Sequence, residues 1–247
     1  ERQKHSGGLI LSDLADSDSI DYAEELPLWP AQQEETMKPA LLDAQERKPD
    51  ASADPSEAIV VVSGLPRSGT SMVMQMLSAV GINPLTDGER AADENNPKGY
   101  FELEKVKQLK TANNWLEEAK GKSIKVVSPL LPYLPQGLSY QVIVIERDID
   151  EIVASQHQML KKIGEDSSDL TDDKLKVYLT GQLNASKNRL HVHDVPWLRI
   201  SHSEAIEHPE QTAEKIAEFL GGGLDVKVMS QVVDVSLHRQ RGQSTPS

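Results

Sequence analysis

Apolar residues along this chain follow two alternating patterns, which are short continuous runs and longer stripes with helical spacing. Short runs rich in β-branched residues are typical of strands buried on both faces of a parallel sheet. Four segments of this kind lie at 59–63, 124–127, 141–145 and 197–200, and a single charged residue, Lys125 or Arg199, interrupts the second and the fourth. The stretches between them carry apolar residues at the i, i+3, i+4 spacing of amphipathic helices. The first stripe consists of Met72, Val73, Met76, Leu77 and Val80.

The stripes predict helices between the strands. We expect helices that begin at Thr70, cover 102–119, begin near Ile149, cover 171–190 behind a Thr171 cap, begin at Pro209 and cover 226–233. Strands that alternate with helices indicate a parallel sheet covered on both faces. The predicted fold class is therefore α/β, in the form of a three-layer P-loop-like fold with a central parallel sheet of four to five strands flanked by helices.

The first part of the chain has a different composition from the rest. Residues 1–56 are acidic, contain five prolines and carry few apolar residues. This composition predicts an extended arm or linker with a short helix near 40–47, followed by an α/β domain at 57–247. Because the sequence begins at Glu1 and not at a methionine, we expect a processed form or a piece of a longer chain with an upstream region.

Composition excludes several classes of function. The net charge of −13 over 247 residues argues against a broad surface for nucleic acid or anionic membrane. The chain has no cysteine, which excludes disulfides, zinc–thiolate sites and cysteine nucleophiles. A chain without cysteines suits a reducing compartment, so we expect a cytoplasmic location. No apolar run reaches the roughly 18 residues of a transmembrane segment.

The residues between the first strand and its helix carry the clearest chemical signal. They read Gly64-Leu-Pro-Arg67-Ser-Gly69-Thr70-Ser71. A strand, a glycine loop and a helix start form a cradle for phosphate, because unpaired backbone N–H groups and the helix dipole favour an anion there. The spacing nearly matches the G-x4-G-K-[ST] loop of nucleoside triphosphatases, but Thr70 stands in place of the lysine and the cation is Arg67. The pattern thus argues against ATP or GTP as the cleaved ligand. A plain glycine turn is the alternative.

A second signal follows the run at 141–145. Arg147 comes directly after this strand, at its carboxyl edge, where open α/β sheets bind ligands. Ser155 follows eight residues later on the next helix. A surface pair between Arg147 and Asp148 is the alternative interpretation.

Together these segments resemble the sulfotransferase superfamily over about residues 58–242. The loop resembles its 5′-phosphosulfate loop, and Arg147 with Ser155 resembles the pair that holds the 3′-phosphate of the donor. Near the end, Arg239-Gln-Arg241-Gly242 resembles the basic segment that closes over the nucleotide. Most members have lysine where this chain has Arg67, and proline where it has Ile149. The donor-binding residues implied by the resemblance are Pro66, Arg67, Ser68, Gly69, Thr70, Ser71, Arg147, Ser155, Arg239, Arg241 and Gly242.

The resemblance also implies a reaction. The donor is 3′-phosphoadenosine 5′-phosphosulfate (PAPS), the acceptor is a hydroxyl or amine of a small alcohol, sugar, lipid or peptide, and no metal is needed. Arg67 neutralises the developing charge, and a glutamate serves as general base. Glu89 lies where protein-tyrosine sulfotransferases have a catalytic Gly-Glu segment. Glu102 ends a segment similar to one in heparan sulfotransferases, and Glu94 is the third candidate. For each, a solvated loop carboxylate is the alternative.

Two other functions remain open from the sequence. One is a P-loop kinase or NTPase, which requires magnesium and a lysine near the phosphates. The other is a catalytically silent nucleotide-binding module. His157, on the helix after Arg147, is expected to be structural.

Overall fold

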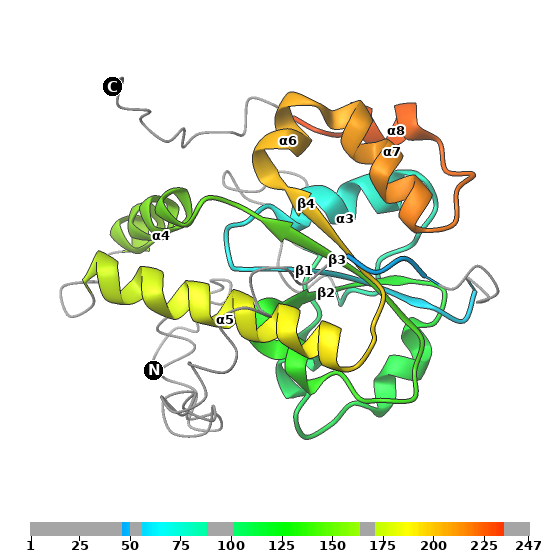
Figure 1. Ribbon diagram of the computed structural model, residues 1–247, viewed down its shortest axis with the longest axis horizontal. Helices are drawn as coiled ribbons and strands as arrows, with labels where there is room; N and C mark the ends of the chain where they lie inside the picture. The colour runs from blue at the N-terminus through cyan, green and yellow to red at the C-terminus, as the bar shows by residue number, and fades with distance from the viewer. Residues whose placement is uncertain (1–45, 50–55, 88–100, 164–170, 235–247) are drawn as a thin grey trace. The chain divides into compact units, whose positions relative to one another are not determined.

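The computed structural model describes residues 46–49, 56–87, 101–163 and 171–234. Within these ranges, four parallel strands form one sheet in the order β2-β1-β3-β4 (Figure 1). The strands are β1 (Ile59–Gly64), β2 (Ser123–Val127), β3 (Tyr140–Glu146) and β4 (Trp197–Ser201). The predicted α/β class with a parallel sheet is confirmed.

The register of the sheet brings the carboxyl ends of its strands to one edge. Gly64, the last residue of β1, pairs with Val127 of β2 and with Ile145 of β3. Glu146 of β3 pairs with Ser201 of β4. The loop after β1 and the segment after β3 therefore leave the sheet side by side, which is the arrangement that the two sequence signals require.

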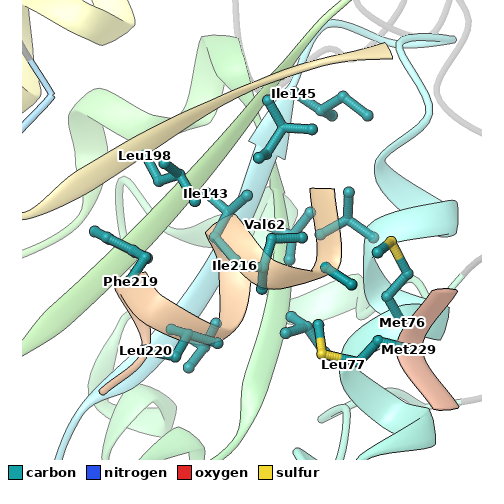
Figure 2. Packing of buried hydrophobic residues seen from close by; sticks show 14 of the residues in the cluster. Val62, Met76, Leu77, Ile143, Ile145, Leu198, Ile216, Phe219, Leu220 and Met229 are labelled. Carbon is teal, nitrogen blue, oxygen red and sulfur yellow. The ribbon is translucent and has the colours of Figure 1, made fainter. Parts of the chain in front are cut away.

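One face of the sheet is covered by helices with a continuous apolar interface. These are α3 (Thr70–Ala79), α6 (His202–Glu207), α7 (Pro209–Phe219) and α8 (Val226–Gln231). Figure 2 shows Val62 of β1 and Ile143 and Ile145 of β3 meeting side chains of α3, α7 and α8, among them Leu77 and Ile216. Because this core packs directly beneath the start of α3, it fixes the position of the loop between β1 and α3.

The opposite face carries the other layer. It contains the 3₁₀ helix η3 (Ser128–Tyr133), which contacts β1 and β2, and the helices α4 (Ile149–Ile163) and α5 (Asp172–Val192). Helix α5 contacts both η3 and α4, and Leu175, Leu179, Leu183 and Leu190 of α5 are buried. These positions repeat every three to four residues, so a single stripe of α5 faces inward. The sheet therefore has helices on both faces, as predicted.

Several predicted helices are wrong in detail. The helix expected at 102–119 is two 3₁₀ helices, η1 (Glu104–Gln108) and η2 (Asn114–Ala119). The chain turns between them through i→i+3 hydrogen bonds such as Thr111 N–H to Gln108 O (2.9 Å), and the Trp115 indole donates to Ala112 O (3.1 Å). Burial of Leu109, Trp115 and Leu116 holds this broken path, so tertiary packing overrides helix propensity here.

Two helix starts also differ from the prediction. Thr171 precedes α5 as expected, but its side chain makes no capping hydrogen bond. The short helix α6 was not predicted, and it begins with Ser201 Oγ accepting the N–H of Glu204 (3.4 Å).

The end of the predicted N-terminal arm lies against the domain. Arg47 forms an antiparallel bridge with Trp197, with N–H to O distances of 3.1 and 3.0 Å in the two directions. This bridge covers part of the outer edge of β4, an edge that otherwise exposes unpaired backbone groups. Arg47 is therefore extended and not helical, whereas 1–45 and 50–55 lie outside the described residues. The proposed boundary between arm and domain stays a prediction.

Candidate active site

The loop between β1 and α3 is shaped by two glycines. A Cβ atom on Gly64 would lie 2.6 Å from the carbonyl oxygen of Ile145 and would collide with Ser68 Oγ. Gly69 has φ of +100°, and a Cβ there would lie 2.7 Å from Cδ2 of His202. Both positions therefore need glycine, one for the close approach of β3 and one for its backbone conformation.

The residues between the glycines place polar groups around the start of α3. Arg67 has a left-handed φ of 71°, and Ser68 N–H bonds to Leu65 O at 3.1 Å, which closes the turn. Met72 N–H bonds to Gly69 O at 3.0 Å, so the first turn of α3 begins at the second glycine, and the start of a helix favours an anion. Ser68 is 1% exposed, and among the described residues its hydroxyl has no hydrogen-bond partner. A buried hydroxyl of this kind indicates that a further polar group belongs in this loop.

The two signatures found in the sequence are in direct contact. Arg67 Nε donates to Ser155 Oγ at 3.1 Å, and Arg147 Nη1 donates to the carbonyl oxygen of Arg67 at 3.1 Å. Ser155 lies on α4 and is 7% exposed. The predicted juxtaposition of loop, strand end and following helix is therefore present in the fold. Two guanidinium groups and a hydroxyl meet at the carboxyl edge of β1 and β3.

Arg147 has a carboxylate partner that the sequence did not suggest. Its Nε donates to Glu151 Oε2 at 2.8 Å, and the two side chains are 10% and 14% exposed. Asp148, the partner in the alternative interpretation, instead accepts the N–H groups of Asp150 (2.9 Å) and Glu151 (3.1 Å) at the start of α4. Arg147 is thus a largely buried cation held in place by a carboxylate and a carbonyl.

Of the candidate bases, Glu102 lies within the described residues. Its Oε1 accepts from Lys125 Nζ at 3.3 Å, and the Lys125 side chain is 10% exposed. Lys125 pairs with Val62, two residues before Gly64, so it points to the face of the sheet that α3 covers. Glu102, whose side chain is 32% exposed, is therefore a carboxylate oriented by Lys125 and not a fully solvated one. Glu89 and Glu94 lie outside the described residues, as do Arg239, Arg241 and Gly242.

The sequence matches the sulfotransferase domain family over residues 57–243. This chain belongs to that family. The loop after β1 and the pair of Arg147 with Ser155 predict the same family, and that prediction is confirmed.

Solved structures with a similar fold include other sulfotransferases. They are the sulfotransferase domain from the curacin biosynthetic pathway (12% identity, 73% of this chain and 88% of that one, TM-score 0.44), sulfotransferase STF9 from Mycobacterium avium (13%, 85% and 74%, 0.44) and STF1 from Mycobacterium tuberculosis H37Rv (14%, 82% and 74%, 0.43). No curated protein matches the sequence.

Two residues of this sulfotransferase site escaped the sequence analysis. Glu151 lies four residues after Arg147, the spacing at which side chains on one helix face meet, and this signal was available. His202 follows β4 directly, and its ring lies over Gly69. The rule that ligands bind at the carboxyl ends of strands would have drawn attention to His202, had β4 been placed beside β3.

Other observations concern the surroundings of the sulfotransferase site. His157 Nε2 lies 2.8 Å from Asp172 Oδ1 and joins α4 to α5, consistent with the structural role expected for it. Within the described part of the chain, no group of three His, Asp or Glu side chains is arranged to hold a metal ion. Among the same residues, no helix combines the length and the apolar character that crossing a bilayer requires.

Proposed function

We propose that this sulfotransferase moves a sulfuryl group from PAPS to a hydroxyl or amine of its acceptor. The observation that carries the proposal is the convergence of Arg67, Arg147 and Ser155, through contacts of 3.1 Å, beside the start of α3. The buried hydroxyl of Ser68 and the two required glycines support an anion in the loop. These residues fit a donor that carries phosphate groups at two separate positions.

Different residues bind the different phosphate groups of the donor. The loop N–H groups with Ser68, Thr70 and Ser71 bind the 5′-phosphosulfate, and Arg147 with Ser155 binds the 3′-phosphate. Pro66 shapes the loop, and Arg239, Arg241 and Gly242 close over the nucleotide from the C-terminal segment. The guanidinium fork of Arg147 suits phosphate oxygens, because its donors match their geometry.

Charge neutralisation at the leaving group falls to Arg67. PAPS supplies a sulfuryl group on a phosphate leaving group. The acceptor oxygen or nitrogen forms a bond to sulfur while the bond from sulfur to the phosphate oxygen breaks in line. Arg67 stabilises the charge that grows on that oxygen. Since arginine does not give up a proton at ordinary pH, the phosphate leaves as an anion.

A glutamate accepts the proton that the acceptor loses. Glu89 is the first candidate, Glu102 the second and Glu94 the third, and none of the proposed roles requires a metal ion. Lys125 supports Glu102 as a positioned carboxylate, since the 3.3 Å contact fixes its direction. A base must lie within hydrogen-bond reach of the acceptor proton. We also propose that the protein is cytoplasmic. The proposed acceptor is an alcohol, a sugar, a lipid or a peptide.

Calorimetric titration tests the donor. We expect adenosine 3′,5′-bisphosphate, the desulfated product, to bind in the micromolar range, and Arg147→Ala and Ser155→Ala to weaken it by about 10- to 100-fold each. ATP with magnesium is the comparison. Tight ATP binding without preference for the bisphosphate would instead favour a kinase or NTPase function. Bisphosphate binding without turnover of PAPS across the four acceptor classes would favour a silent module.

Metal dependence separates the same alternatives in a second way. We expect turnover of PAPS to be unchanged in excess chelator, because protein cations do the work that magnesium does in phosphotransferases. Loss of turnover on chelation, restored by added magnesium, would contradict the metal-free mechanism.

A further inference from the structure

Glu151 is a nearly buried carboxylate that the proposed transfer does not use. Its side chain is 14% exposed and its Oε2 lies 2.8 Å from Arg147 Nε. The backbone N–H of Glu151 is bound by Asp148, and the Arg147 guanidinium is bound by the carbonyl of Arg67 at 3.1 Å. Both partners of the ion pair are therefore fixed, and the carboxylate stays beside the cation.

This carboxylate changes the charge that a phosphate meets. Arg67 and Arg147 bring two positive charges to the site, and Glu151 cancels one of them. A phosphate that binds the Arg147 guanidinium comes to share it with the carboxylate, since both groups accept from the same planar fork. Two anions held a few ångströms apart repel each other strongly where water is largely excluded.

Repulsion between Glu151 and the 3′-phosphate helps the desulfated product to dissociate. This product keeps both phosphates through which the donor is recognised, so a site that holds the donor tightly also holds the product tightly. Release of product limits turnover in many enzymes. A fixed negative charge beside the 3′-phosphate speeds dissociation, because most differences in affinity appear in the off-rate.

We propose that Glu151 is a built-in counter-charge that weakens the hold of Arg147 on the 3′-phosphate and so sets the rate of nucleotide release. This inference rests on the proposed donor site. It assigns to Glu151 a role in tuning affinity and not a role in the chemical step.

Isosteric removal of the charge tests the proposal. Glu151→Gln keeps an oxygen that accepts from Arg147 and removes the negative charge. We expect the affinity for adenosine 3′,5′-bisphosphate, measured by calorimetry, to rise about tenfold, and its off-rate in stopped flow to fall by a similar factor. Adenosine 5′-monophosphate, which lacks the 3′-phosphate, should change less than about twofold.

A matched control lies one residue away. Asp150→Asn removes the same charge from the same helix turn, but Asp150 pairs with Lys176 at 2.6 Å and its side chain is 70% exposed. We expect it to change the bisphosphate affinity by less than about twofold, since exposed charges are screened. Glu151→Asp keeps the charge and should give no comparable gain. If Glu151→Gln proves too unstable to titrate, Glu151→Met removes the charge with an apolar side chain of similar length.

The outcomes separate the two proposals. Wild-type protein that does not bind the bisphosphate would overturn the donor site and this inference with it. Wild-type protein that binds, with Glu151→Gln binding equally or more weakly, would overturn the counter-charge alone and make Glu151 a positioning residue for Arg147. An equal gain for the monophosphate, or from Asp150→Asn, would also overturn it, because the effect would then be general.

Discussion

The loop between β1 and α3 and the segment that carries Glu102 are built differently in this sulfotransferase. The loop from Gly64 to Ser71 is shaped mainly by its own backbone, through glycines and a hydrogen bond between residues three apart, and Arg147 is the distant side chain that binds its Arg67 carbonyl. The segment around Glu102 is held by side chains from elsewhere. Thr86 Oγ1 donates to Glu102 O at 2.6 Å, Asp87 Oδ2 accepts the N–H of Glu104 at 2.5 Å, and Lys125 binds the Glu102 carboxylate.

The difference explains why the loop can be predicted from the sequence and the segment around Glu102 cannot. A loop built from its own backbone leaves a fixed pattern of glycines and hydroxyls in a short stretch of chain. A segment held by distant side chains can be built from many combinations of residues. Acceptor recognition through such a segment can vary while the donor loop stays the same. Four experiments probe this contrast, beginning with the largest expected effect.

Loss of the loop cation should have the largest effect. Arg67→Ala is expected to lower turnover by about 1000-fold, because the charge on the leaving oxygen loses its partner. The melting temperature should change little, since Arg67 is only partly buried. Arg67→Lys keeps the charge and serves as the control with partial activity. Turnover of Arg67→Ala at the wild-type rate would disprove the assignment of this loop.

The base assignment can be decided by a paired comparison. Glu89→Gln should lower turnover by about 100-fold with little change in donor affinity, as expected for loss of a general base. Glu102→Gln should lower it by less than about tenfold, through loss of the oriented contact with Lys125. Steady-state kinetics with PAPS and calorimetry with the bisphosphate measure the two effects. A larger loss in Glu102→Gln than in Glu89→Gln would move the base to Glu102.

The free energy of unfolding should show how strongly the loop depends on its glycines. Gly64→Ala is expected to destabilise the protein by about 2 kcal/mol in urea unfolding, because its methyl group meets Ile145 O and Ser68 Oγ. Gly181→Ala is the control, on α5 with open space around the added methyl group, and should stabilise by about 0.5–1 kcal/mol. Equal effects of the two substitutions would contradict the close approach of β3 to the loop.

The smallest effect is expected from loss of the hydrogen bond between Thr86 and the Glu102 carbonyl. Thr86→Val removes the hydroxyl that donates to Glu102 O and should cost about 1 kcal/mol of stability and about threefold in turnover. Thr111→Val is the control, since its hydroxyl donates within its own turn, to Gln108 O at 3.3 Å. If both variants lower turnover equally, the contact between Thr86 and Glu102 does not position the acceptor side.

The elements of the fold were largely predictable, with one informative failure. Buried parallel strands give mostly apolar runs, interrupted here only by Lys125 in β2 and Arg199 in β4 among the charged residues, so all four were located to within a residue or two. The region 102–119 was predicted as one helix, because its apolar residues fit helical spacing. Burial of Leu109, Trp115 and Leu116 imposes a turn there instead, and no local propensity records such a constraint.

The candidate site shows the same division. Arg67, Arg147 and Ser155 were predicted from their spacing and lie in contact with one another, whereas their role in binding the donor stays a prediction. The neighbours Glu151, His202 and Lys125 were not predicted, although the spacing of Glu151 from Arg147 is visible in the sequence, and each lies in a different element. Whether a carboxylate or an imidazole reaches the loop depends on the packing of those elements and on side-chain direction.

By itself, the sequence determined the succession of strands and helices along the chain, the glycine loop after the first strand and the position of its cation. These features depend on residues close together in the chain. Periodicity sets an element, and glycine sets a turn, through steric limits on a few neighbouring dihedrals. The tertiary structure decided that β1 and β3 are neighbours, that Glu151 shares Arg147 and that Lys125 orients Glu102. Such contacts depend on strand order and helix packing, which are settled by the free energy of the whole core.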